Sequence, residues 1–560
     1  MARTAGIGCQ DFGQLIENHV FYVDKTIFIK EWWENKDIVT LITRPRRFGK
    51  TLTIDMVEKF FSIKYTGRGD LFEGLAIWQE EEYRKLQGTY PVISLSFANI
   101  KEVNYKNCRR KICYLLGNLY SDNSFLMESG ILTPMEQEFF KSISMDMGDV
   151  EASLALNELS KYLCRYYGKK VIILLDEYDT PMQEAYVNGY WEELTAFSRG
   201  IFNAAFKTNT SLERAIMTGI TRVSKESIFS DLNNLTIVTA TSKKYQDCFG
   251  FTQDEVLDAL EEYGLAEQKK EVRDWYDGFT FGERRDIYNP WSIINYLSQQ
   301  KFSTYWADTS SNRLVGKLVR EGNQEIKMAM EQLLNGKCLC VEIDEQIVFS
   351  QLDEEEGAIW SLLLASGYLK VEKYITDMEW GTERYELSLT NKEVRIMFQN
   401  MIKGWFRKSE SAYNAFVKAL LCADVKGMNA YMNKVALDTI SYFDTGKKPS
   451  EETEPERFYH GFVLGLIVEL AGRYTITSNR ESGLGRYDVM LEPLQDDDAV
   501  ILEFKVYDPE EEDTLADTVA AALAQIEQKQ YAASLAAKGI APVRIRKYGF
   551  AFEGKKVLIG

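Results

Sequence analysis

The aliphatic residues of the N-terminal half form short runs that alternate with stretches of helical spacing. Residues 37–43 read as a buried strand, whereas apolar residues recur three or four positions apart in residues 50–63. Further strand-like runs occupy residues 92–97, 171–175 and 215–220. Because parallel strands alternate with helices and are buried on both faces, this pattern predicts an α/β fold built on a parallel sheet.

The pattern changes beyond residue 250, where helical spacing prevails. We expect helices at residues 254–263, 267–276 and 290–299. Residues 355–403 then read as a helix, two strands and another helix, an order that favours a winged-helix-like module. Residues 446–457 are polar and charged and hold two prolines, so we interpret them as a linker before a final compact α/β segment.

Composition and charge narrow the functional classes. The 560 residues include 66 basic and 84 acidic ones, a formal net charge of -18, which argues against non-specific adhesion to nucleic acid but not against a local basic groove. No apolar run approaches the ~20 residues that span a bilayer, and residues 1–11 lack the features of a signal peptide. With eight scattered cysteines, we expect a reduced, cytoplasmic protein without a membrane partner.

The segment Arg44-Pro-Arg-Arg-Phe-Gly-Lys-Thr51 lies between a predicted strand and a predicted helix, which is the context of a phosphate-binding loop. Gly49 allows close approach of the backbone to phosphate oxygens, Lys50 neutralises phosphate charge, and the Thr51 hydroxyl can bind Mg²⁺. Arg44 stands where such loops carry their first glycine, so a basic loop before a helix is the alternative. The candidate cofactor-binding residues are Arg44, Pro45, Arg46, Arg47, Phe48, Gly49, Lys50 and Thr51.

The aliphatic run at residues 171–175 ends in Asp176 and Glu177. In a nucleotide hydrolase the first acid holds the metal and the second polarises the attacking water. The alternative is a buried strand with a solvated acidic end. The two motifs together predict an ATPase that uses ATP and Mg²⁺. Thr51 and Asp176 would bind the metal, and Glu177 would be the catalytic residue that polarises the water.

The next predicted strand ends in Thr218-Gly-Ile-Thr-Arg222. Thr218 or Thr221 is placed to sense the γ-phosphate, and Arg222 to act as an arginine finger or sensor. A strand end with a capping threonine and a surface arginine would look the same.

The C-terminal segment contains two carboxylates and a lysine that form a second candidate site. Asp488 begins one predicted strand, and Glu503 and Lys505 lie two positions apart on the next, so they share a face. Asp488 and Glu503 can bind Mg²⁺, while Lys505 orients or deprotonates water for phosphodiester cleavage. A strand with charges on its solvated face would show the same alternation.

Predicted helices before and after these strands supply further polar candidates. A helix over residues 456–469 carries Glu456 and His460, either of which can complete the site. A helix over residues 520–535 carries Gln525, the candidate from the later helix.

The N-terminal motifs resemble the AAA-ATPase-like family of bacterial proteins that is fused to a C-terminal PD-(D/E)XK nuclease-like domain. That family tends to have arginine at the position of Arg44. The resemblance implies a P-loop ATPase parallel sheet with a helical lid and a winged-helix-like middle, followed by a small α/β PD-(D/E)XK nuclease-like domain. The matching stretches are Phe12, Tyr22–Thr26, Arg44–Thr51, Leu174–Pro181, Thr218–Arg222, Trp275–Phe279, Tyr288–Trp291 and Tyr305–Ser310.

We therefore expect a core at residues 1–250, a lid at 251–345, a winged-helix-like or helical connector at 346–445 and the nuclease-like domain at 455–560. The hypothesis is that ATP binding or hydrolysis gates Mg²⁺-dependent cleavage of DNA, in defence or mobile-element biology. The alternative is a nucleotide-switched regulator that binds nucleic acid or protein through an inactive nuclease-like domain. A third is a motor or remodeller that forms homo-oligomers.

Overall fold

The computed structural model folds into two compact units, the first made of Met1–Leu314 and Cys338–Met397 and the second of Val315–Lys337 and Phe398–Gly560. The four-part division expected from the sequence stays a prediction. The residues that the structure describes are 2–221, 229, 232–307, 315–316, 318–319, 324–343, 357–376, 383–406, 410–439, 463–464, 466–467, 470, 473–482, 485–509 and 511–560.

A five-stranded parallel sheet with the order β2-β3-β4-β1-β5 forms the centre of the first unit. The parallel sheet and four of its strands were predicted correctly, and the short edge strand β5 was not. Strand β4 lies between β1 and β3, so the carboxyl ends of these three strands adjoin. The strands are β1 (Val39–Thr43), β2 (Val92–Ser96), β3 (Val171–Asp176), β4 (Leu212–Gly219) and β5 (Leu235–Val238).

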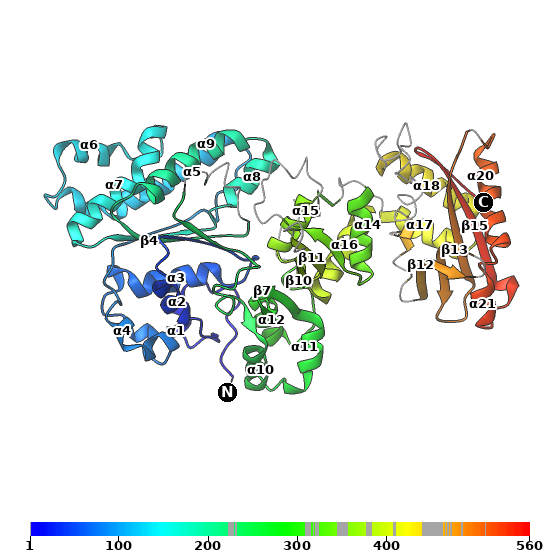
Figure 1. Cartoon of the computed structure of the whole chain (residues 1–560), viewed down its shortest axis with the longest axis horizontal. Coiled ribbons are helices and arrows are strands. Elements are labelled where there is room, and N and C mark those ends of the chain that lie inside the picture. Colours follow the sequence, from blue (N-terminus) through cyan, green and yellow to red (C-terminus); the bar gives the residue numbers. More distant parts are fainter. Residues whose placement is uncertain are drawn as a thin grey trace. The chain divides into compact units, whose positions relative to one another are not determined.

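Alternate residues of each central strand enter two different cores, which explains the unbroken apolar runs. Leu41 and Ile173 pack into one core, and Ile42 and Ile172 into the other. Figure 1 shows a helical layer on each side of the sheet. One layer contains α5 (Tyr105–Asp122), α6 (Pro134–Ser142), α7 (Asp149–Tyr167), α8 (Thr180–Asn188) and α9 (Trp191–Phe202), and the other α1 (Phe12–Glu17), α2 (Ile27–Asn35), α3 (Lys50–Phe61) and α4 (Glu81–Arg84).

The segment that follows the sheet contains the three expected helices and a β-hairpin that was not predicted. Strands β7 and β8 pair with each other, and β8 also pairs with the short strand β6. The aromatic residues Phe279 and Phe281 on β7 are buried. The elements are β6 (Phe251–Thr252), α10 (Gln253–Glu262), α11 (Lys269–Tyr276), β7 (Asp277–Phe281), β8 (Arg284–Tyr288) and α12 (Pro290–Gln299).

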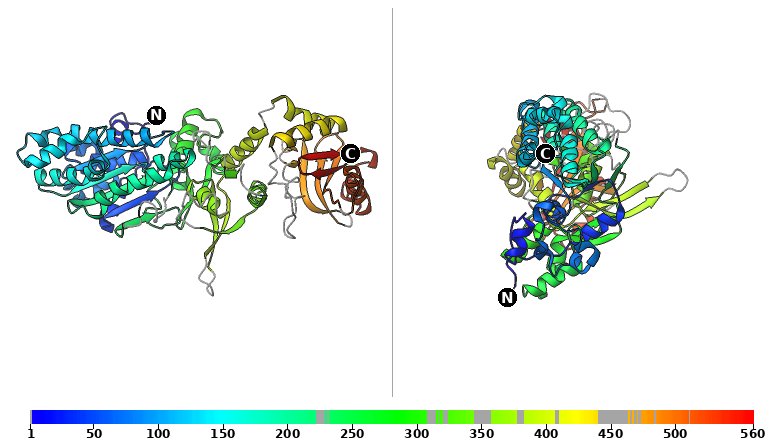
Figure 2. Two further views of the ribbon diagram at one scale, coloured as in Figure 1. Left: turned by 90° about the horizontal axis from the view of Figure 1, so that it is seen from above. Right: turned by 90° about the vertical axis from the view of Figure 1, so that its left-hand side faces the viewer.

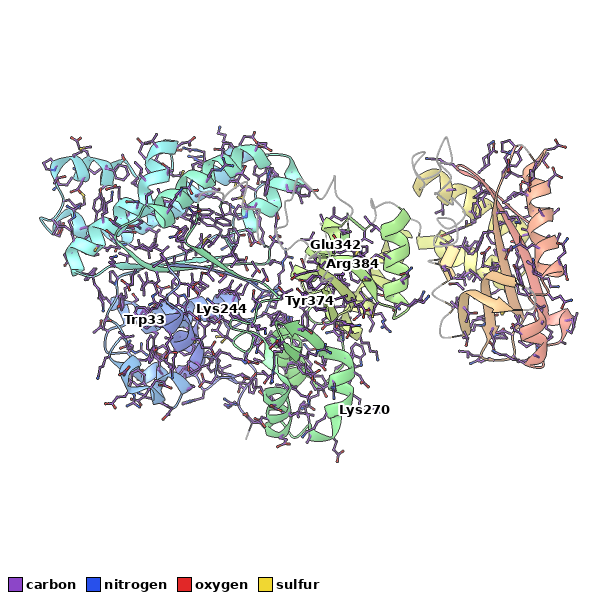
Figure 3. All side chains as sticks on the ribbon, viewed as in Figure 1. Trp33, Lys244, Lys270, Glu342, Tyr374 and Arg384 are labelled. Atoms are coloured by element: carbon purple, nitrogen blue, oxygen red, sulfur yellow. The ribbon has the colours of Figure 1, made fainter. Side chains whose placement is uncertain are left out.

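The predicted helix, two strands and helix are present as α15 (Ala358–Ala365), β10 (Leu369–Thr376), β11 (Glu383–Leu389) and α16 (Lys392–Phe406). A third strand, β9 (Leu339–Glu342), pairs with β11 and was not predicted. Figure 3 labels Glu342, Arg384 and Tyr374 on this sheet, where the first two form an ion pair of 3.5 Å. The hairpin of β10 and β11 projects from the first unit in both views of Figure 2. Its membership of the winged-helix class stays a prediction.

The second unit contains a mixed five-stranded sheet with the order β12-β13-β14-β15-β16. Strands β14 and β15 are parallel, and the other pairs are antiparallel. The helix expected over residues 520–535 is two helices, because the chain breaks at Gln530, whose φ is 53°. The predicted linker at residues 446–457 lies outside the described residues. The elements are α14 (Gln324–Leu334), α17 (Glu410–Leu421), α18 (Val425–Thr439), β12 (Tyr474–Ser482), β13 (Gly485–Pro493), β14 (Ala499–Val506), α20 (Leu515–Gln528), α21 (Ala533–Ala537), β15 (Ile545–Glu553) and β16 (Lys556–Ile559).

Within the part of the chain that is described, no helix combines the length and the apolar character that crossing a bilayer requires.

Candidate functional site

The phosphate-binding loop predicted from the sequence connects β1 directly to α3. Gly49 precedes the first residue of α3 and has a φ of 82°, a left-handed conformation that glycine adopts without strain. Arg47 also has a left-handed backbone, with a φ of 65°. The turn therefore places the N-terminus of a 12-residue helix beside the loop, where unpaired N–H groups favour an anion.

The Lys50 side chain is folded back into this loop. Its ammonium donates hydrogen bonds to the carbonyl oxygens of Arg44, at 2.9 Å, and Pro45, at 2.8 Å. Burial lowers the pKa of Lys50, while the nearby carboxylates of Glu177 and Asp176 act in the opposite direction. Phosphate oxygens that enter the loop would compete with two neutral carbonyls for this cation.

Asp176 joins the ends of the three adjacent strands. Its carboxylate accepts a hydrogen bond of 2.7 Å from the Thr51 hydroxyl and one of 2.5 Å from the Thr218 hydroxyl. Burial raises the pKa of Asp176, and the two hydroxyl donors lower it. A hydroxyl and a carboxylate in contact are oxygen ligands that suit Mg²⁺, so the donor set fits the predicted metal.

The two acids that follow Asp176 are held differently. Glu177 is half-buried with a φ of 50°, and it accepts a hydrogen bond of 3.1 Å from the Thr180 hydroxyl. Asp179 is buried and accepts hydrogen bonds from the backbone N–H and the hydroxyl of Thr221, at 2.9 and 2.8 Å. Of the two sensor candidates, Thr218 therefore contacts Asp176, whereas Thr221 contacts Asp179.

The side chain of Arg44 is wholly buried at the base of the loop. Its guanidinium donates to the carbonyl oxygens of Thr43, at 2.9 Å, and Thr239, at 2.6 Å. It also lies 4.4 Å from the ring centroid of Phe281. The arginine in place of glycine thus links the ends of β1 and β5 to the hairpin of β7 and β8. The assignment of Arg44 as a cofactor-binding residue stays a prediction. Because its side chain makes the contacts above, any contact with a cofactor would come from its backbone.

The remaining loop side chains contact neighbouring elements. Arg46 donates a hydrogen bond of 3.2 Å to Gln183 on α8. Arg47 lies 4.3 Å from the ring centroid of Trp291, and Phe48 packs against Phe279 at 4.8 Å between centroids.

Two residues that sequence reasoning did not assign hold the loop from outside. The carbonyl oxygen of Arg46 accepts hydrogen bonds from the Asn289 side chain, at 3.2 Å, and from the Trp306 indole, at 3.0 Å. Both donors lie in stretches that carry the family resemblance, which was the only signal for them. Arg222 lies outside the described residues, so its role stays a prediction.

In the second unit, Asp488 on β13 and Glu503 on β14 lie on adjacent strands. The backbone N–H of Phe504 donates to the Asp488 carboxylate at 2.8 Å, and the N–H of Asp488 lies 3.4 Å from the Glu503 carboxylate. Glu503 is buried, and its neighbours Leu502 and Phe504 face the opposite core. The structure thus brings the two predicted carboxylates together on one face, with half-buried Lys505 two positions further along it.

Gln525 on α20 reaches the same place. Its amide donates hydrogen bonds to the Glu503 carboxylate and, at 3.2 Å, to the hydroxyl of Tyr531, which sequence reasoning did not assign. Gly549 on β15 permits this approach, because a Cβ there would lie 2.8 Å from the carbonyl oxygen of Val519 on α20. His460 and the alternative Glu456 lie outside the described residues.

Among the described residues, the carboxylates that meet at this second site are those of Asp488 and Glu503. In the described ranges, no three His, Cys, Asp or Glu side chains are grouped so that they could hold an ion. Two carboxylates, with an amide that orients one of them, nevertheless match the oxygen ligands of Mg²⁺, which retains several waters in most protein sites.

Comparison with known proteins identifies two domains in the chain. Residues 6–229 match the family model described as a predicted AAA-ATPase, and residues 454–560 match the PD-(D/E)XK nuclease superfamily. The chain is also 26% identical over 394 residues to an uncharacterized protein in the vnfD 5' region of Azotobacter chroococcum mcd 1, a match that covers 70% of this chain and 68% of that protein. The predicted order, an ATPase-like domain followed by a PD-(D/E)XK nuclease-like domain, is confirmed.

Proposed function

We propose that this chain binds and hydrolyses ATP with Mg²⁺ in its first unit and thereby controls a Mg²⁺-dependent nuclease that cleaves DNA in its second. The observation that carries the proposal is the pairing of two oxygen-rich sites on one chain. One joins Thr51 to Asp176, and the other joins Asp488 to Glu503.

In the ATP site each group has a distinct task. Lys50 would exchange its two carbonyl partners for phosphate oxygens, and the N-terminus of α3 would stabilise the same charge. Thr51 and Asp176 would hold Mg²⁺, which when bound neutralises charge on the phosphates. Glu177 would orient water, and Thr218 would couple the end of β4 to the state of Asp176.

In the nuclease site the buried carboxylate of Glu503 and that of Asp488 would hold Mg²⁺, which when bound activates water and stabilises the phosphorane charge. Lys505 would orient or deprotonate that water from the same strand face. Gln525 would fix the Glu503 carboxylate in the orientation that binds the metal.

The two halves are tested separately. Lys50→Ala should abolish binding of a fluorescent ATP analogue and leave the folding of the chain intact, as followed by circular dichroism. Asp488→Ala should abolish Mg²⁺-dependent cleavage of plasmid and single-stranded DNA while ATP binding is retained. Unchanged nucleotide affinity in the first variant or unchanged cleavage in the second would contradict the corresponding half.

One observation favours the second candidate function, a nucleotide-switched regulator with an inactive nuclease-like domain. The carboxylates of Asp488 and Glu503 already accept hydrogen bonds from the Phe504 N–H and the Gln525 amide, contacts that would equally hold the fold of an inactive site. The decisive experiment incubates the protein with DNA or RNA and Mg²⁺ or Mn²⁺, with and without ATP. Nucleic-acid binding without cleavage in every condition would favour the regulator.

The proposal extends to the cellular location and the oligomeric state of the protein. We place the protein in the cytoplasm, with a role in defence or mobile-element biology and a capacity for homo-oligomers. Size measured by light scattering with and without ATP tests the assembly, and Arg222 is the residue to substitute if rings form.

A further inference from the structure

Glu393 is a fully buried acid in the first turn of α16. One carboxylate oxygen accepts hydrogen bonds from the backbone N–H groups of Trp306, at 2.5 Å, and Ala307, at 3.3 Å. The other accepts a hydrogen bond of 2.8 Å from the Ser292 hydroxyl on α12. Burying a carboxylate is costly unless such donors surround it, so this contact fixes the start of α16 firmly.

The side chain of the same residue, Trp306, contacts the phosphate-binding loop. The Trp306 indole is 2% exposed and donates to the carbonyl oxygen of Arg46 at 3.0 Å. Its ring packs against Phe279 and Tyr368, each at 5.4 Å between centroids. One buried residue therefore bonds to the loop through its side chain and to α16 through its backbone.

Helix α16 has a particular place in the chain. It runs from Lys392 to Phe406, and the boundary between the two compact units falls inside it, after Met397. The helix start is also held by Asn391, whose amide donates to the carbonyl oxygen of Tyr276 at 3.2 Å. A displacement of the loop at Arg46 would thus be passed to a helix whose residues belong partly to the first unit and partly to the second.

We propose that Trp306 is a positioning residue that, together with Glu393, couples nucleotide occupancy of the phosphate-binding loop to helix α16 and through it to the second unit. The inference rests on the proposed binding of ATP. It adds a route by which nucleotide binding would reach α16. Bound phosphates would draw Lys50 away from the carbonyl oxygens of Arg44 and Pro45, and this would change the conformation of the loop next to Arg46. Residues in such a path act without touching the nucleotide.

The test compares amide hydrogen exchange of residues 392–406 with and without Mg²⁺ and the non-hydrolysable analogue AMP-PNP. Trp306→Phe removes the indole donor but keeps an aromatic ring and the backbone contact with Glu393, and Asn289 still bonds to the Arg46 carbonyl. We expect AMP-PNP to change exchange in this helix at least threefold in the wild type and not in Trp306→Phe. The affinity of Trp306→Phe for AMP-PNP should fall by less than about tenfold, which corresponds to the loss of one hydrogen bond.

Trp32→Phe is the matched control, because Trp32 is another buried tryptophan of the first unit whose indole donates a hydrogen bond, of 3.2 Å to Thr40, away from the loop. It should retain the response. Glu393→Gln, which keeps the size of the side chain, should lose it as Trp306→Phe does. A response that persists in both variants overturns the inference alone, as does a wild type that binds AMP-PNP without any response. A wild type that binds no nucleotide overturns the proposed function as well.

Discussion

Arg44→Gly would restore the glycine that phosphate-binding loops usually carry, and we expect it to damage this protein. The arginine is fully buried, bonds to the carbonyl oxygens of Thr43 and Thr239, and lies over Phe281. A glycine can supply none of these contacts and leaves a cavity at the junction of β1, β5 and the hairpin.

The magnitude follows from the contacts that are lost. A hydrogen bond to a charged group contributes about 1.5–3 kcal/mol, and a buried cation–π contact can reach about 2 kcal/mol. The cost of burying the guanidinium, which the variant avoids, offsets part of this sum. We expect the variant to lower the free energy of opening at β1 and β5 by about 3 kcal/mol, near the upper end for single substitutions.

Amide hydrogen exchange of peptides covering residues 39–43 and 235–238 measures this local free energy without assuming that a two-unit chain unfolds in one step. Arg44→Lys should give an intermediate loss, because lysine keeps the charge but not the planar fork. Arg110→Ala is the control, since Arg110 is exposed and pairs with Asp146 at 3.1 Å, a contact worth about 0–1 kcal/mol. An opening free energy in Arg44→Gly within about 0.5 kcal/mol of the wild type would refute the structural role of Arg44, by the usual scatter of surface changes.

Three further outcomes are expected. Burial raises the pKa of Asp176, so between the ordinary aspartate pKa and the raised one the native state binds more protons than the unfolded chain. The free energy of opening around Asp176 should therefore fall as the pH rises through that window. Asp176→Asn should abolish ATP hydrolysis and remove this pH dependence, as measured by amide hydrogen exchange of residues 171–176. Gln525→Ala should reduce Mg²⁺-dependent cleavage about 10–100-fold with unchanged ATP binding, whereas Lys529→Ala, at the exposed end of the same helix, should have little effect; equal rates for both variants would contradict the orienting role. Gly549→Ala should destabilise the second unit by about 1–3 kcal/mol in thermal unfolding, because its Cβ would meet the Val519 carbonyl, and an unchanged midpoint would show that α20 shifts freely.

Local patterns were enough to predict most of the elements that carry the sites. The continuous apolar run before Asp176 indicated a strand buried on both faces, and the spacing of Glu503 and Lys505 indicated a shared strand face, which the two cores on either side of β14 confirm. Burial of the strands dominates these patterns, so each can be read from a few neighbouring residues.

The contacts that complete the sites depend on pairing over long distances in the chain. Asn289 and Trp306 meet Arg46 more than 240 positions away, and nothing in their local spacing indicates that meeting. Strand β9 has only four residues and none of them is buried, so it lacks the long aliphatic run by which the strands of the parallel sheet were found. The break after α20 depends on one left-handed residue, Gln530, where propensity favours a continuous helix.

The contacts of the loop side chains suit a loop that lacks the usual first glycine to the proposed binding of a nucleotide. Arg44 and Phe48 are buried among neighbouring elements, while Arg46 and Arg47 contact Gln183 and Trp291. A loop held on every side has little conformational entropy to lose when phosphate binds, so its backbone can be preorganised by packing instead of by a glycine-rich sequence. It follows that substitutions in the hairpin or at Trp306 should weaken ATP binding by loosening the loop, although none of these residues is expected to touch the nucleotide.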